Sequence, residues 1–146
     1  MATINPYLNF MGNTEEAFGF YKSVFGGDFL AVQRFKDTPE ADRVPEAEKE
    51  KLMHIALPVG KNVLMATDAL ESMGHKVTPG TNFHLSVDTE TEAEADQIFK
   101  GLSAGGTVTL PLQKMFWGAY FGMLTDKFGI QWMVNFDYNL SQKAGS

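Results

Sequence analysis

The sequence falls into two similar halves, and this internal repeat restricts the fold more than any single motif does. Each half is predicted to contain a strand, a helix and three further strands, in that order. The predicted elements of the first half are a strand at 3–10, a helix from about 14 to 25, and strands at 28–35, 51–59 and 62–67. Those of the second half are a strand at 83–87, a helix at 91–103, and strands at 107–115, 117–124 and 130–136.

Short segments of the two halves can be aligned with each other. The aligned pairs include Tyr7–Phe10 with His84–Val87, Gln33–Phe35 with Gln113–Met115, and Gly60–Leu64 with Gly129–Met133. A chain of 146 residues is long enough to bury one core. We therefore predict a single domain with module 1 at about 1–68, a linker at about 69–81 and module 2 at about 82–138.

Local signals mark the ends of several elements. Asn13 or Thr14 is expected to cap the first helix through a side-chain oxygen, and the acidic residues that follow suit its positive N-terminal end. Segment 36–50 is charged and contains two prolines, so we expect a mobile loop or a short helix there. Residues 126–129 are expected to form a turn, because Asp126 can accept hydrogen bonds from its own downstream backbone while Gly129 tolerates a positive φ.

The composition argues against several classes of protein. A net charge of −6 disfavours a nucleic-acid-binding surface, which would carry a basic stripe. The absence of Cys excludes disulfides, thiolate zinc sites and cysteine nucleophiles. No apolar run approaches the roughly 20 residues that span a bilayer. The N-terminus lacks a basic region followed by an apolar block. We expect a cytoplasmic protein with neither nucleic-acid nor membrane partners.

Several motifs carry a resemblance to a known family. They are Asn5–Phe10, Gly12-Asn13, Phe20-Tyr21, Leu64-Met65, Asp68-Ala69, Phe116-Trp117, and Thr125–Gly129 with Trp132. Together with the two halves, these motifs resemble the vicinal oxygen chelate superfamily (glyoxalases, bleomycin-resistance proteins and dioxygenases), and in particular its PhnB-like branch. The resemblance implies an α+β fold in which two βαβββ modules form a cup, and a homodimer. That branch often carries a demethylubiquinone-methyltransferase label. No glycine-rich loop suited to S-adenosylmethionine is visible here, so we do not expect a methyltransferase.

The resemblance also implies where a metal ion would bind. In the superfamily the metal ligands come from the first and last strands of each half, and they must all face the cup. Strand alternation puts Trp132, Val134 and Phe136 in the core and turns Gln131, Met133 and Asn135 the other way. The ligand positions then hold Tyr7 (or Pro6), Leu64, His84 and Met133. Because only His84 is a good donor, we expect no metal and no other cofactor. A divalent metal at a His54, His84 and Asp68 cluster is the alternative.

The same alternation predicts the residues of a ligand site. We expect a small organic molecule to contact Tyr7, Asn9, His54, His84, Gln113, Phe116, Trp117 and Met133. His84 is the candidate catalytic residue, as an orienting group or general base, and a pocket-wall histidine without chemistry is its alternative role. A structural role is expected for His54, and solvent exposure for His75. Phe116 and Trp117 have core or dimer contacts as their alternative.

Two functional hypotheses follow from these residues. The first is a protein that binds or sequesters a small organic molecule in a metal-free cup. The second is an enzyme of the lyase, isomerase or dioxygenase type that uses an atypical His/Asp metal cluster. The lack of donors at three of the four ligand positions favours the first hypothesis, and two potentially cup-facing histidines keep the second one open.

Overall fold

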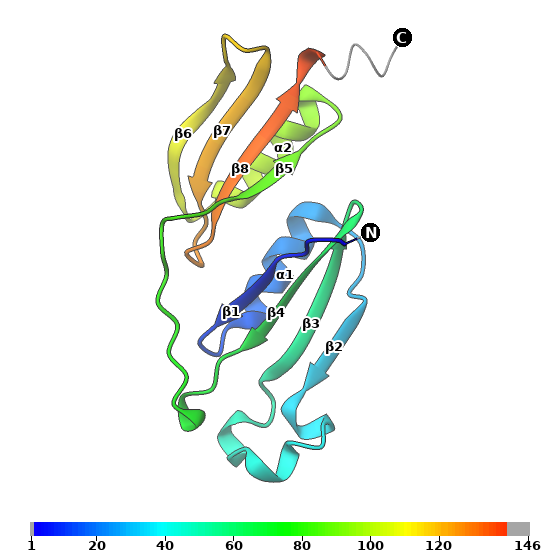
Figure 1. Ribbon diagram of the computed structural model, residues 1–146, viewed down its shortest axis with the longest axis vertical. Helices are drawn as coiled ribbons and strands as arrows, with labels where there is room; N and C mark the ends of the chain where they lie inside the picture. Colours follow the sequence, from blue (N-terminus) through cyan, green and yellow to red (C-terminus); the bar gives the residue numbers. More distant parts are fainter. Residues whose placement is uncertain (1, 140–146) are drawn as a thin grey trace. The chain divides into compact units, whose positions relative to one another are not determined.

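The computed structural model describes residues 2–139, which form two compact units, one ending at Thr78 and the other beginning at Pro79 (Figure 1). Each unit contains one four-stranded sheet and one α-helix. In both units the chain order is strand, helix and three strands. The predicted α+β fold built from two βαβββ modules is confirmed. Neither the α-helices nor the shorter helices within the described residues combine the length and apolar character that crossing a membrane requires.

The first unit is a mixed sheet with the strand order β1-β4-β3-β2. Its elements are β1 (Tyr7–Phe10), α1 (Thr14–Phe25), β2 (Ala31–Arg34), β3 (Leu52–Val59) and β4 (Asn62–Asp68). β1 runs parallel to β4, whereas β2, β3 and β4 pair antiparallel. The segment expected to be a loop or a short helix consists of three 3-10 turns, η1 (Phe35–Asp37), η2 (Ala41–Arg43) and η3 (Glu46–Glu48), and η4 (Glu71–Met73) follows β4.

The second unit repeats this arrangement with the strand order β5-β8-β7-β6. Its elements are β5 (Leu85–Asp88), α2 (Glu92–Ser103), β6 (Thr107–Lys114), β7 (Ala119–Thr125) and β8 (Gln131–Asp137). β5 is parallel to β8, and the remaining pairs are antiparallel. The two parallel strands of each unit are distant in the sequence: α1, β2 and β3 lie between β1 and β4, and α2, β6 and β7 lie between β5 and β8.

Each sheet buries one face and leaves the other open. In the first unit the buried face carries Leu8, Phe10, Ile55, Leu57, Leu64 and Ala66, with Ala17, Phe18 and Tyr21 of α1. In the second unit Trp132, Val134 and Phe136 are buried, and the residues between them are only half-buried. The predicted alternation along β8 is therefore confirmed, and it follows from the period of two in a pleated strand.

The structure corrects two predictions about which face a residue occupies. Leu64 is only 4% exposed and lies on the helix-covered face, so its expected position facing the cup is wrong by one residue. Met65 has the opposite orientation, because neighbouring strand residues point to opposite faces. Alternation along the strand predicted at 83–87 would bury Phe83 if His84 faces the cup, but Phe83 is 56% exposed. It lies outside the sheet because pairing of β5 with β8 begins at Leu85.

The predicted turn before β8 is confirmed, and its aspartate binds more groups than expected. Asp126 Oδ1 accepts hydrogen bonds from the backbone N–H groups of Phe128 (2.8 Å) and Ile130 (3.0 Å). Its Oδ2 accepts a hydrogen bond from the indole N–H of Trp132 at 2.8 Å. Gly129 has a φ of 89°, a value that glycine reaches without strain. One carboxylate therefore fixes both the turn and the first buried side chain of the strand.

Candidate functional site

The first candidate site is the open face of the first sheet, which we call the first open face. It carries the side chains of β1–β4 that alternate with the buried ones: Tyr7, Asn9, Gln33, His54, Met65 and Thr67. The strand register places Tyr7 beside Met65 and Asn9 beside Thr67. Three of the predicted ligand-binding residues, Tyr7, Asn9 and His54, are therefore on one face.

Tyr7 and His54 form a direct polar pair on this face. The Tyr7 hydroxyl lies 3.3 Å from His54 Nδ1, and the two rings stack with their centroids 5.9 Å apart at an angle of 29°. Burial raises the pKa of the Tyr7 phenol, and a side-chain hydrogen bond with Thr67 partly offsets that rise. Tyr7 therefore keeps its proton near neutral pH, and the His54 tautomer decides which of the two groups is the donor. In the tautomer protonated on Nε2, the Tyr7 hydroxyl donates to Nδ1 and the Nε2–H group remains a donor for a ligand.

Asp68 has a structural role that sequence reasoning missed. Its Oδ1 accepts a hydrogen bond from Thr14 N at 3.0 Å and its Oδ2 accepts one from Leu52 N at 2.8 Å, and the residue is 3% exposed. The carboxylate thus pairs one of the N–H groups that α1 leaves open at its N-terminus. Asn13 occupies the N-cap position but makes no side-chain capping bond. Capping of this helix by Asn13 or Thr14 was therefore the wrong prediction, because the cap comes from β4.

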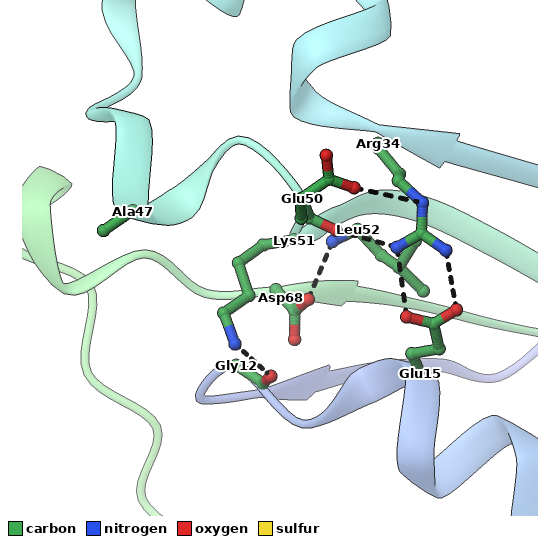
Figure 2. A pocket seen from close by; sticks show the side chains of 8 residues that line it. All are labelled: Gly12, Glu15, Arg34, Ala47, Glu50, Lys51, Leu52 and Asp68. Atoms are coloured by element: carbon green, nitrogen blue, oxygen red, sulfur yellow. Dashed lines mark hydrogen bonds and ion pairs between the residues drawn. The ribbon is translucent and has the colours of Figure 1, made fainter.

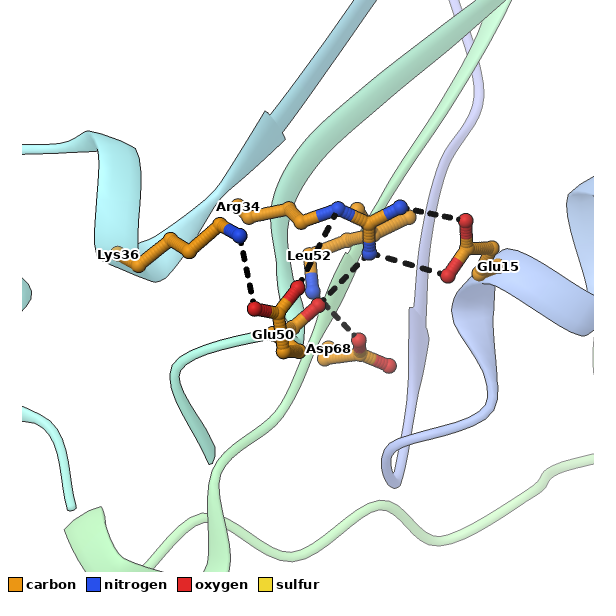
Figure 3. Close-up of polar contacts among 6 residues, drawn as sticks. All are labelled: Glu15, Arg34, Lys36, Glu50, Leu52 and Asp68. Carbon is orange, nitrogen blue, oxygen red and sulfur yellow. Dashed lines mark hydrogen bonds and ion pairs between the residues drawn. The ribbon is translucent and has the colours of Figure 1, made fainter. Parts of the chain in front are cut away.

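A charged hollow of about 390 Å³ lies beside this cap, and Figure 2 shows the residues that line it. The Arg34 guanidinium donates to both carboxylate oxygens of Glu15, at 2.6 and 3.0 Å, and to the backbone carbonyl of Glu50 at 2.8 Å. Lys36 binds the Glu50 carboxylate at 2.8 Å (Figure 3). Lys51 Nζ donates to the Gly12 carbonyl at 2.9 Å.

These contacts make the charged hollow a clamp between secondary-structure elements. The Arg34 hydrogen bond and charge lower the pKa of Glu15, and Glu15 in turn raises the pKa of Arg34. Arg34 and Lys36 extend from β2 and η1 and Glu15 from α1, so the pairs tie the helix to the edge of the sheet. Because the charges in the hollow already neutralise one another, a charged ligand would have to displace existing ion pairs. We therefore do not place the ligand site here.

The second candidate surface is the open face of the second sheet, which we call the second open face. Its side chains are Ser86, Gln113, Phe121, Met123, Met133 and Asn135. Met133 pairs directly with Met123, and Phe121 with both Gln113 and Asn135. The predicted ligand residues Gln113 and Met133 therefore share a face that combines aromatic and thioether side chains with polar ones.

An exposed aromatic pair adjoins the second open face at the β6–β7 turn. Trp117 contacts the ring of Phe121 with centroids 6.1 Å apart, and Phe116 contacts Trp117 at 5.1 Å. Phe116 is 97% exposed and Trp117 52%, so neither belongs to the core of its unit. His84 is half-buried and lies immediately before β5, next to Phe83, whose carbonyl accepts a hydrogen bond from the Gln131 side chain.

Two tyrosines connect the second sheet to α2. The Tyr120 hydroxyl donates to Asp96 Oδ1 at 2.6 Å, and the Tyr138 hydroxyl donates to Glu92 Oε2 at 2.9 Å. The hydrogen bond to Asp96 is the main cause that raises the pKa of Tyr120 to about 12. For Tyr138, burial and then the bond to Glu92 raise the pKa. Both phenols therefore hold the helix against the sheet as neutral donors.

The side chains present do not fit a divalent metal site. Within residues 2–139 no three His, Asp or Glu side chains are grouped so that they could hold an ion. Of the cluster considered from the sequence, Asp68 already accepts two backbone N–H groups, and His54 Nδ1 lies 3.3 Å from the Tyr7 hydroxyl. His54 and Asp68 belong to the first unit and His84 to the second. A chelate needs three or four converging donors, and the positions implied by the resemblance do not supply them.

Comparison with known proteins identifies relatives over nearly the whole chain. The family model described as "Glyoxalase/Bleomycin resistance protein/Dioxygenase superfamily" matches residues 3–134. Protein YjdN from Escherichia coli is 30% identical over 140 residues, which cover 90% of this chain and 93% of that protein. Among solved structures, PA1353 from Pseudomonas aeruginosa is similar, with a TM-score of 0.82 and 39% identity over 94% of this chain and 98% of that one. A Bacillus cereus PhnB protein, titled a putative 3-demethylubiquinone-9 3-methyltransferase, has a TM-score of 0.75 and 27% identity over 92% and 99% of the chains.

Proposed function

The chain belongs to the glyoxalase/bleomycin resistance protein/dioxygenase superfamily, in its PhnB-like branch, and we propose that it binds a small organic molecule on its open sheet faces without a metal ion. The observation that carries the proposal is the Tyr7–His54 pair on the first open face. It places a phenol hydroxyl and an imidazole together on the face that also carries Met65, the strand partner of Tyr7. Ligand sites commonly combine apolar walls with a few such polar groups.

The second open face supports the same proposal with a different chemistry. Met123, Met133 and Phe121 offer polarisable apolar surface, and the Gln113 amide offers both a donor and an acceptor. A flat molecule that combines an apolar part with hydrogen-bonding groups matches both faces. His84 stays the proposed orienting group or general base of the second unit, because imidazole both donates and accepts protons near neutral pH.

The donor chemistry supports binding without a metal ion. Leu64 is buried under the helix, and Met133 is a poor ligand for hard divalent cations. To coordinate an ion, the Asp68 carboxylate would have to lose its hydrogen bonds from two backbone N–H groups. We therefore propose no lyase, isomerase or dioxygenase step that depends on a metal at these residues.

The test combines ligand titration with elemental analysis. The neutral probe 1-naphthylmethanol is titrated into the full chain by calorimetry, together with the His54→Phe variant and Lys61→Gln as the control on the exposed β3–β4 turn. Losing the imidazole donor should weaken binding about five-fold, the effect of one hydrogen bond, whereas Lys61→Gln should change it less than two-fold. The purified protein should hold fewer than about 0.1 metal ion per chain, because a chelate needs several donors. About one ion per chain, or no saturable binding of either the probe or its carboxylate analogue 1-naphthoate, would sink the proposal.

A further inference from the structure

A second hollow, of about 550 Å³, opens within the first unit, next to the first open face. Asn9 and Thr67 belong both to the open face and to the lining of this hollow. Because Thr67 also contacts the Tyr7 phenol, the Tyr7–His54 pair and the hollow share one polar boundary. Its volume lies within the range of about 300–1,000 Å³ typical of small-molecule sites. We call it the β4-end hollow, since it lies where β4 ends and the chain continues into η4.

The walls of the β4-end hollow are mainly apolar. Phe35 and Met53 line one part of it. Met73, the last residue of η4, and Val77, four residues further along the chain, line another part. Phe35 belongs to a buried cluster with Val44 and Leu70, against which Met53 packs. The wall is therefore anchored to the core of the 3-10 turns, and it offers two thioethers that adapt to an irregular ligand.

The rim of the hollow carries two basic side chains, His75 and Lys76. The turn before them is fixed by hydrogen bonds from His75 N to Leu70 O at 3.2 Å and from Leu70 N to His75 Nδ1 at 3.3 Å. Because Nδ1 accepts a bond, the neutral imidazole carries its proton on Nε2 and remains a donor. Lys76 makes no ion pair with any residue between 2 and 139.

One carboxylate, Asp68, also lines the hollow. Both of its oxygens accept backbone N–H bonds, one of them at the positive N-terminal end of α1. These bonds direct its charge toward the helix and the start of β3, and they partly neutralise it. The unpaired charge at the mouth of the hollow is therefore the ammonium of Lys76.

From this combination we infer that the β4-end hollow takes a small amphiphilic organic anion, with its apolar body against Met53 and Met73 and its acidic group at His75 and Lys76. The inference deepens the proposed function and rests on it. The net charge of −6 repels anions at long range, but at physiological salt such repulsion is screened beyond about 8 Å. Selection for an anion must therefore come from local groups, and Lys76 with His75 supplies them.

The experiment compares two probes that differ only in charge. Calorimetric titration of the full chain with 1-naphthoate and with 1-naphthylmethanol is repeated for Lys76→Gln and for the control Lys61→Gln. Lys76→Gln should weaken naphthoate binding about five-fold, the upper range for an exposed ion pair, and should leave naphthylmethanol binding unchanged. Lys61→Gln should affect neither probe. The naphthoate preference should also shrink as salt is raised, because the pairing groups are exposed.

The location is checked by backbone amide chemical shifts, with Ala69 and Val77 as the reporters that line the hollow. Naphthoate should shift both amides at lower concentration than it shifts Phe121 of the second open face. If naphthylmethanol binds and naphthoate binds no better, or if Lys76→Gln leaves naphthoate unchanged, the inference is overturned and the proposed function stands. If neither probe binds, both are overturned.

Discussion

The role of Asp68 gives a quantitative test of how the first unit is held together. Replacing Asp68 by Ala removes the acceptor for Thr14 N and for Leu52 N, both of which are buried with it. An orphaned buried donor costs about 1–3 kcal/mol, and loss of a helix cap typically costs about 1 kcal/mol. We expect Asp68→Ala to lower the free energy of unfolding by about 3 kcal/mol. Asp68→Asn keeps one acceptor oxygen and should cost about half as much.

Urea denaturation followed by circular dichroism measures these changes, with Asp88→Asn as the control. Asp88 is exposed in β5, and its carboxylate accepts a hydrogen bond from the Asn135 side-chain amide at 3.2 Å, which the amide oxygen introduced by the substitution can also accept, so Asp88→Asn should change stability by less than about 0.5 kcal/mol. Amide exchange should also speed up first at Thr14 and Leu52. A loss below about 1 kcal/mol for Asp68→Ala would refute the capping role. A drop in bound metal with unchanged stability would instead favour Asp68 as a metal ligand.

Three further predictions concern the helices, the tyrosines and assembly. The pKa of Tyr120 in the folded protein is about 12, raised from 10.0. Its hydrogen bond to α2 therefore stabilises the fold fully below about pH 10, and this contribution is lost as the pH rises toward 12. In an ultraviolet titration, the Tyr120→Phe variant should lack the ionisation step near pH 12. Gly122→Ala should lower the free energy of unfolding by about 1–3 kcal/mol, because a Cβ would lie 2.8 Å from the Phe99 ring. Gly19→Ala in α1 has open space around it and should raise the free energy of unfolding by about 0.5–1 kcal/mol in the same urea assay. The homodimer implied by the family should appear in light scattering as twice the mass of the chain. Trp117→Ser should weaken the dimer, because Trp117 and Phe116 form an exposed aromatic pair. A monomer at micromolar concentration would contradict this prediction.

The candidate site could be predicted from the sequence only in part. Strand alternation correctly placed Met133 on the face opposite the buried Trp132, because side chains alternate between the two faces along the whole strand. The same reasoning failed for Leu64, where the two halves were aligned one residue out of register. The grouping of Tyr7 with His54 was anticipated only as a shared face, because the contact joins residues 47 positions apart across an intervening strand. The role of His84 and the absence of a bound metal stay predictions.

What the sequence determined by itself is the order of elements and the local chemistry of each. The repeat predicted two βαβββ modules, and Asp126 predicted a turn, because these depend on neighbours a few residues apart. Only the tertiary structure decided that Asp68 caps a helix 54 residues away and that His75 and Lys76, expected in a linker, border a hollow at the end of β4. Such contacts join residues that are far apart in the sequence and meet only when the strands and turns pack together. A local pattern of residue types and spacings therefore does not reveal them.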